Sequence, residues 1–251
     1  SKSSGEDRKQ RQNTADSQLI NLKRIRKKIR NLADGYRPRS NWTGYASQCN
    51  YDQQAFDEKK KLVARFLSMI KPQRVLDIGC NTGDFSYLAA ELGSETIAAD
   101  QDHDVVEVLY RRLKSNPSKI TPIVLDLCNP TPPVGFMNRE RVGFLSRIEV
   151  DCVLALALVH HLRVSGNLNL EAIRDLFFDL TERHLVLEFV PTHDSMFRRL
   201  SQLRRESFED FTLGCFREVF LERFEFQREE TIPGTERTLL LLRKRSAKTD
   251  P

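Results

Sequence analysis

Three aspartates and a pair of glycines are the residues of this chain best suited to binding a ligand. Asp77 precedes Gly79 and Gly83 in the segment Val75-Leu-Asp-Ile-Gly-Cys-Asn-Thr-Gly-Asp-Phe-Ser86, and Asp100 and Asp126 follow farther along the chain. Glycine lets the backbone turn tightly and approach a ligand closely. Carboxylates accept hydrogen bonds from ribose hydroxyls or an exocyclic adenine amine, and they tolerate positive charge. The set therefore predicts a site for a cationic, ribose-bearing ligand.

The same glycine segment disfavours ligands that carry phosphate. The dinucleotide fingerprint G-x-G-x-x-G needs glycine at positions 81 and 84, where this chain has Asn81 and Asp84. Asp84 also puts a carboxylate at a helix start, where a pyrophosphate would bind. A phosphate-binding loop that ends in G-K-[ST] is absent from the sequence.

His160, His161 and Glu188 are the candidates for proton transfer. The two histidines end the apolar segment 150–159, and Glu188 stands within the apolar segment 185–190. Adjacent side chains of a strand point to opposite faces, so one histidine should face the ligand, and we expect His161. A structural, backbone-bonded histidine is the alternative for either one. We interpret Glu188 as pocket-lining, the alternative being a buried ion pair, because an unpaired buried carboxylate is costly.

These candidates follow predicted strands that alternate with predicted helices. Apolar segments predict strands at 74–78, 95–99, 120–125, 150–159 and 184–190, and a closing hairpin at 224–229 and 238–242. Helical periodicity predicts helices at 52–70, 83–92, 105–113, 170–180 and within 195–220. Such alternation predicts a doubly wound α/β sheet, in which ligands bind at the carboxyl ends of the strands.

Residues 74–162 resemble the class I S-adenosylmethionine (SAM)-dependent methyltransferases, and the resemblance extends over about 42–245. It implies a Rossmann-like, doubly wound, seven-stranded sheet with an antiparallel last strand, here preceded by an N-terminal helical extension. The usual middle glycine of the family pattern D-x-G-x-G-x-G is Asn81, a departure that the family tolerates. Part of the chain is similar to a little-characterised bacterial group, some of whose members are associated with nodulation or surface-glycan genes. The stretches that carry this likeness are Gly79-Cys-Asn-Thr-Gly83, Gly135-Phe-Met-Asn-Arg-Glu-Arg141, Ala155-Leu-Ala-Leu-Val-His-His-Leu162 and Glu188-Phe-Val-Pro191.

The resemblance implies SAM as the cofactor. It puts the methionine part near Gly79, the ribose at Asp100 and the adenine at Asp126 and Leu127. The full set of implied cofactor contacts is Asp77, Gly79, Cys80, Asn81, Gly83, Asp100, Gln101, Asp126 and Leu127. His161, His160 and Glu188 are the catalytic candidates.

Tyr45 and Tyr51 are the predicted substrate-binding residues. Together with Trp42 they precede the first long helix of the body, where many class I enzymes fold a lid over the cofactor. Aromatic rings there would exclude water and attract a sulfonium. A hydrophobic staple onto the domain edge is the alternative.

We expect no metal ion. His160, His161, Glu188 and His193 are suitable ligand types. Metal-dependent RNA 3′-end 2′-O-methyltransferases, however, resemble this fold and carry Glu-x-x-Glu-His where this chain has Ala157 and His160.

Positive charge is concentrated in the N-terminal segment. Residues 1–40 hold 12 Lys and Arg against 4 Asp and Glu, whereas the other residues hold 28 against 31, within a chain of 251 residues and net charge +5. We expect a disordered leader at 1–18, a basic amphipathic helix with its linker at 19–40 and the methyltransferase domain at 41–251. The helix suits RNA phosphates or an anionic membrane surface. A docking helix whose solvated face is basic is the alternative.

These features favour a SAM-dependent methyltransferase that acts on a hydroxyl of a small molecule or glycan. The alternatives are an RNA methyltransferase that uses the basic N-terminal helix, and a non-catalytic SAM-binding interaction module. Five cysteines without a C-x-x-C pair, the lack of a signal peptide and the lack of a membrane-spanning apolar run predict a cytoplasmic protein. The sequence leaves the acceptor and the oligomeric state open.

Overall fold

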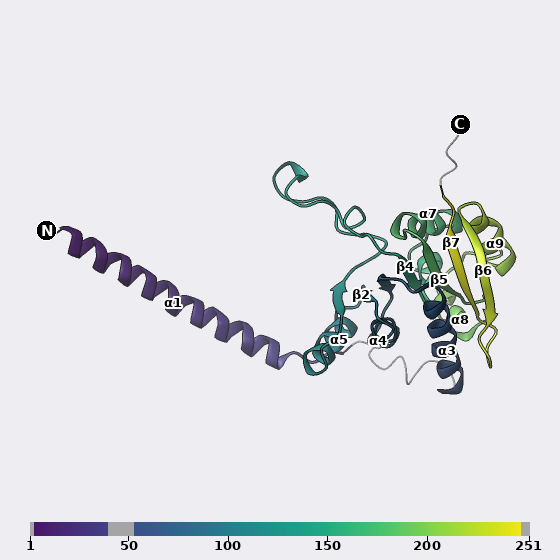
Figure 1. Ribbon diagram of the computed structural model, residues 1–251, viewed down its shortest axis with the longest axis horizontal. Coiled ribbons are helices and arrows are strands. Elements are labelled where there is room, and N and C mark those ends of the chain that lie inside the picture. The colour runs from purple at the N-terminus through teal and green to yellow at the C-terminus, as the bar shows by residue number, and fades with distance from the viewer. Residues whose placement is uncertain (1–2, 40–52, 247–251) are drawn as a thin grey trace. The chain divides into compact units, whose positions relative to one another are not determined.

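The computed structural model describes the backbone of residues 3–39 and 53–246 and the side chains of residues 15–39 and 53–246 (Figure 1). It consists of two units, residues 1–39 and 40–251, each of which is described by itself. The first unit holds α1 (Ser3–Gly35). This helix begins inside the segment expected to be a disordered leader, and its backbone shows no break at residue 18. The division into leader, basic helix and methyltransferase domain stays a prediction.

The second unit is built on a seven-stranded sheet with the order β3-β2-β1-β4-β5-β7-β6. Its strands are β1 (Arg74–Ile78), β2 (Glu95–Asp100), β3 (Ile120–Val124), β4 (Cys152–Ala155), β5 (His184–Phe189), β6 (Phe224–Thr231) and β7 (Thr238–Lys244). The first five strands are parallel, and β7 is antiparallel to both of its neighbours. The predicted Rossmann-like doubly wound sheet with an antiparallel last strand is therefore confirmed. Strand order reverses between β1 and β4, which is where such sheets bind ligands.

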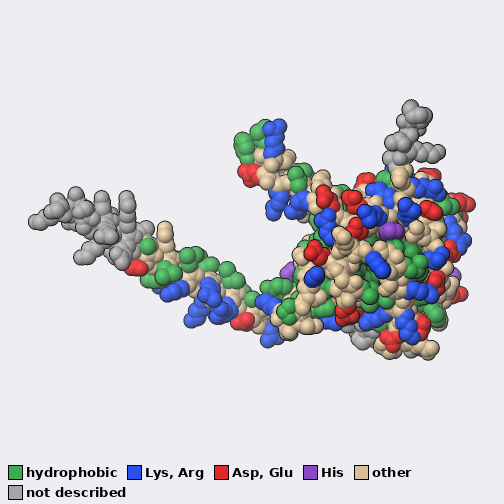
Figure 2. Space-filling model, in the orientation of Figure 1, with side chains coloured by type: hydrophobic (Ala, Val, Ile, Leu, Met, Phe, Trp, Pro, Cys, Tyr) green, Lys and Arg blue, Asp and Glu red, His purple; other side chains and the backbone are tan. Residues whose placement is uncertain are grey.

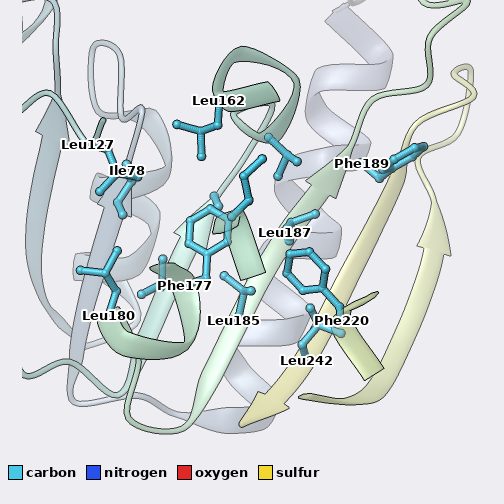
Figure 3. Packing of buried hydrophobic residues seen from close by; sticks show 14 of the residues in the cluster. Ile78, Leu127, Leu162, Phe177, Leu180, Leu185, Leu187, Phe189, Phe220 and Leu242 are labelled. Atoms are coloured by element: carbon cyan, nitrogen blue, oxygen red, sulfur yellow. The ribbon is translucent and has the colours of Figure 1, made fainter. Parts of the chain in front are cut away.

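Helices cover both faces of the sheet, because side chains of each strand alternate between two apolar layers. Val75, Leu154 and Val186 pack with α3 (Gln53–Ile70) and α4 (Asp84–Glu91) on one face. Leu76 and Leu185 contribute to the opposite layer, with side chains of α6 (Val159–Val164), α7 (Leu170–Leu180), α8 (Ser195–Ser201) and α9 (Leu213–Leu221). Figure 3 shows this second layer, with strand and helix side chains in contact. A smaller cluster joins α4, β2 and α5 (His103–Ser115).

Polar side chains begin most of these helices. Asp102 accepts a hydrogen bond from the backbone N–H of Asp104, which starts α5 directly after β2. Asn169, Asp194 and Thr212 cap α7, α8 and α9 in the same way. Each cap satisfies an N–H that has no partner within the helix, so the sequence fixes these starts locally.

Two elements differ from the sequence prediction. β4 ends at Ala155 instead of residue 159, because Ala157 has a positive φ of 50° that turns the chain away from the sheet and into α6. His160 and His161 consequently lie on a helix and not at a strand end. The predicted helical segment 195–220 is divided into α8 and α9. Among the helices that the structure describes, none combines the length and apolar character needed to cross a bilayer.

Candidate functional site

A cleft with a volume of about 270 Å³ lies at the carboxyl ends of β1, β2, β3 and β4. The order of these strands brings together loops that are far apart in the sequence. Six residues of the predicted cofactor set line it, namely Gly79, Asn81, Asp100, Gln101, Asp126 and Leu127. His161 lines it as well, from α6.

The loop after β1 is held tightly against the end of β2. The N–H groups of Gly79 and Cys80 both donate to the carbonyl of Ala99, at 2.8 and 3.1 Å. Gly79 has a φ of +73°, and a Cβ there would lie 3.4 Å from Leu158 Cδ1. Glycine therefore suits this position because of the left-handed φ, whereas a Cβ there would make an ordinary contact with Leu158.

Asn81 takes the place of the family's usual middle glycine for a local reason. Its φ is +50°, a conformation that asparagine adopts more readily than most side chains. Its Oδ1 accepts a hydrogen bond of 2.7 Å from the N–H of Thr82, which stabilises the turn. The departure from the family pattern thus keeps the backbone geometry that glycine would supply.

Three residues of the predicted cofactor set do not line the cleft. Gly83 has a φ of +87°, and a Cβ there would lie 2.5 Å from Leu109 Cδ1, so this glycine serves the packing of α4 against α5. Cys80 is buried beside Tyr87 and Leu109. Asp77 is buried beneath the loop and accepts a 2.5 Å hydrogen bond from Ser86 Oγ, which joins β1 to α4. Burial raises the pKa of Asp77 to about 6, against the effect of this hydrogen bond.

Asp100 is oriented by backbone donors on both of its oxygens. Oδ2 accepts from the N–H of Asn81 at 3.0 Å, and Oδ1 accepts from the N–H of Asp102 at 2.9 Å. Burial raises the pKa of Asp100, and the backbone N–H donors oppose this rise. The N–H of Gln101 is a further backbone donor to this carboxylate. Because a carboxylate has about four acceptor sites, Asp100 keeps capacity to accept a hydrogen bond from a ligand in the cleft.

The charge of the cleft is negative. Asp100, Asp102 and Asp126 line it, and the described lining residues include no Lys or Arg. Asp126 is oriented by the N–H of Cys128, which donates to its Oδ1 at 2.9 Å. Such a cleft attracts a cationic ligand and repels phosphate, as the sequence predicted.

The two histidines have different environments because successive residues of a helix point about 100° apart. His161 lines the cleft, and burial lowers its pKa to about 4, so its imidazole is neutral at pH 7 and able to accept a proton. His160 is 1% exposed and does not line the cleft. Neither ring nitrogen of His160 has a hydrogen-bond partner in the described part of the chain. Strand alternation, from which one histidine was expected to face the ligand, does not apply, because both histidines lie on α6. That His161 faces a ligand stays a prediction.

Glu188 lies in a buried ion pair and not in the cleft. Its Oε2 is 2.5 Å from Lys59 Nζ, and its Oε1 is 3.2 Å from an Arg237 guanidinium nitrogen. Arg237 also contacts Asp194, the cap of α8. The pocket-lining, catalytic interpretation of Glu188 is therefore replaced by its alternative. A carboxylate within an apolar strand indicates that a buried cation pairs with it. The local sequence does not identify that cation, because the partners of Glu188 come from distant segments.

Several lining residues were not among the predicted contacts. Asp102, Ser165 and Gly166 belong to this group, as does the run 156–158 after β4. One signal in the sequence could have identified lining residues here, namely that this run follows a predicted strand at the point where strand order reverses. The predicted substrate residues Tyr45 and Tyr51, with Trp42, lie outside the described residues.

No family model matches this sequence. The chain is 36% identical over 199 residues to the nodulation protein NoeA of Rhizobium meliloti (strain 1021). The match covers 79% of this chain and 42% of NoeA, so the chain spans less than half the length of this relative. The identity confirms the predicted resemblance to a nodulation-associated group.

Solved structures of methyltransferases share the fold. N-methyltransferase NodS from Bradyrhizobium japonicum WM9, in complex with S-adenosylhomocysteine, matches with a TM-score of 0.57 at 14% identity, over 82% of this chain and 100% of NodS. Magnesium protoporphyrin IX methyltransferase ChlM from Synechocystis PCC 6803, with bound S-adenosylhomocysteine, matches with a TM-score of 0.55 at 16% identity, over 76% and 84%. A putative O-methyltransferase from Nostoc punctiforme PCC 73102 gives 0.56 at 18% identity, over 81% and 60%. At these identities the likeness establishes the fold, and it confirms the predicted fold class.

Proposed function

We propose that this chain, which has the fold of the class I methyltransferases, is a SAM-dependent enzyme that methylates a hydroxyl of a small molecule or glycan. The observation that carries the proposal is the cleft at the reversal of strand order. It joins Gly79, Asp100 and Asp126 from three successive strand ends and has no cationic side chain among its described lining residues. A sulfonium with an attached adenosine has the charge and the polar groups that this lining complements.

The lining residues suit the separate parts of SAM. Asp100 would accept from the ribose hydroxyls, since backbone N–H groups already fix the orientation of the carboxylate. Asp126 would accept from the adenine amine, while Leu125, Leu127 and Leu162 supply apolar walls for the ring. Bound SAM supplies an electrophilic methyl group.

His161 is the proposed base of the reaction. Its position on the cleft lining places an imidazole that is neutral at pH 7 where an acceptor hydroxyl could donate to it. The burial that lowers its pKa also makes it a weaker base than an exposed histidine. Holding the acceptor in line with the methyl group can supply much of the rate acceleration. The acceptor class is proposed from the resemblance to a group associated with surface-glycan genes, and NoeA, a nodulation protein, is consistent with that group.

Calorimetric titration of the full chain with S-adenosylhomocysteine tests the cofactor site. Asp100→Asn should weaken binding by about 10- to 100-fold, because charged hydrogen bonds contribute about 1.5–3 kcal/mol. Asp179→Asn is the matched control, since Asp179 is exposed on α7, away from the cleft lining. If the native chain does not bind, or if both variants bind like the native chain, the proposed site is wrong.

Labelled donor incubated with separate pools of glycans, small hydroxylated compounds, amines and RNA tests the reaction. We expect label in a hydroxyl-bearing pool, and we expect His161→Ala to abolish transfer while S-adenosylhomocysteine binding stays within about threefold of native. Transfer to RNA or amines alone would refute the acceptor class. Binding without transfer to any pool would support the non-catalytic alternative, and unchanged transfer by His161→Ala would exclude this residue as the base.

A further inference from the structure

Helix α1 exposes a continuous apolar stripe. Leu22, Ile25, Ile29 and Leu32 recur at intervals of three and four residues, which places them on one side of the helix. These side chains are 63%, 52%, 61% and 76% exposed, respectively. Figure 2 shows hydrophobic side chains along one side of this helix and basic side chains along the other. Four large aliphatic side chains in one exposed row favour contact with an apolar phase.

Basic residues border this stripe on both sides. Six Lys and Arg side chains lie between residues 23 and 30, namely Lys23, Arg24, Arg26, Lys27, Lys28 and Arg30. At 100° per residue, Arg26 and Lys28 lie about 80° to either side of the centre of the stripe. Asp16 and Asp34 are the acidic residues among the described side chains of α1. The helix therefore combines an apolar row, which has one cation on each border, with four further Lys and Arg on the opposite side.

We propose that α1 is an interfacial helix that binds this protein to an anionic lipid surface. On such a surface the apolar stripe enters the boundary between headgroups and acyl chains, while the bordering cations contact the anionic headgroups. Clusters of four to eight Lys and Arg on an amphipathic helix are typical of this binding mode. The helix lies in the plane of the surface, in agreement with its lack of membrane-spanning character.

A second copy of α1 or an RNA would each explain only one of the two features, the apolar stripe or the basic residues. A second copy of α1 would cover the stripe, but it would bring Arg26 and Lys28 of two chains together at the edges of the contact, where like charges repel. RNA would neutralise the basic residues but leave the aliphatic row in water. An anionic bilayer accommodates both the stripe and its border.

Co-sedimentation of the full chain with vesicles tests the proposal without a cofactor or an acceptor, so its outcome is independent of the proposed reaction. We expect binding to phosphatidylcholine vesicles that contain about 30% phosphatidylglycerol, and at least about tenfold weaker binding to pure phosphatidylcholine. The pair Ile25→Gln and Ile29→Gln keeps the charge and should weaken binding at least about tenfold. The pair Arg26→Gln and Lys28→Gln keeps the stripe and should weaken it about thirtyfold.

Substitutions outside α1 control for the general effect of losing charge or hydrophobicity on vesicle binding. Leu221→Gln changes an exposed aliphatic side chain of α9, and the pair Lys114→Gln and Lys119→Gln removes two charges outside α1. Both controls should bind like the native chain.

Equal binding to both kinds of vesicle, or native binding by either α1 variant, would overturn the proposal. Loss of RNA binding in the variant at Arg26 and Lys28 alone, with no vesicle binding by the native chain, would identify RNA as the occupant instead. Self-association that the isoleucine variant abolishes, again without vesicle binding, would identify a second copy.

Discussion

Replacing Glu188 by Gln tests whether the buried charges around this residue stabilise the fold and take no part in cofactor binding. The native cluster holds two cations, Lys59 and Arg237, and two carboxylates, Glu188 and Asp194. Lys59, Arg237 and Glu188 are 4%, 3% and 0% exposed, respectively. The change keeps the size of the side chain but removes the negative charge between the two cations.

The expected destabilisation is large because water cannot replace the lost charge. Arg237 keeps Asp194, with contacts of 2.8 and 3.1 Å, whereas the ammonium of Lys59 loses its 2.5 Å partner. Breaking a buried pair by removing one member costs about 3–5 kcal/mol. For a domain of this size, that corresponds to a fall in Tm of about 6–20 °C.

Thermal and urea unfolding of the full chain measure this effect, and calorimetry with S-adenosylhomocysteine measures binding. Glu230→Gln is the matched control, because Glu230 pairs with Arg65 at the surface and such pairs contribute about 0–1 kcal/mol. Adding Lys59→Met to Glu188→Gln should restore part of the stability, since it removes the buried ammonium that paired with the lost carboxylate.

Cofactor affinity should be unchanged, because Glu188 does not line the cleft. If Glu188→Gln unfolded like the control while binding or methyl transfer fell by tenfold or more, the structural assignment of this carboxylate would be wrong. A double variant less stable than Glu188→Gln alone would contradict the ion-pair explanation.

Two further predictions concern Asp77 and Gly83, which flank the loop between β1 and α4. Asp77 has a folded pKa of about 6 against an ordinary value of 3.8, so its ionisation should lower the free energy of unfolding by about 2 kcal/mol as the pH rises from 4 to 7. Asp77→Asn should lack this loss and gain stability relative to the native chain over that interval in urea unfolding, whereas parallel pH profiles would contradict the burial argument. Gly83→Ala should cost about 2–4 kcal/mol, because its Cβ would meet Leu109 and its φ is +87°. Gly93→Ala, with a φ of +103° and open space around it, should cost only about 1–2 kcal/mol by the same measurement, and equal losses would exclude the packing explanation.

Local patterns in the sequence predicted the sheet and much of the proposed cofactor lining. Parallel strands share one edge for their carboxyl ends, so Asp100 and Asp126, which follow β2 and β3, were expected to lie together and do line one cleft. The sequence alone also shows that a phosphate-binding loop is lacking and that Asp84 stands at a helix start. Both features agree with a cleft whose described lining residues include no Lys or Arg.

Tertiary contacts decided what each buried group does. The assignment of Gly83 to packing depends on Leu109, in another helix, and that of Glu188 depends on Lys59 and Arg237, which belong to distant segments. His161 faces the cleft because Ala157 ends β4 early. Hydrophobic periodicity reports which side of an element is buried, but the partners it meets there depend on how all the elements pack. The sequence therefore determined where polar groups gather, and only the folded chain determined which of them meet a ligand and which meet each other.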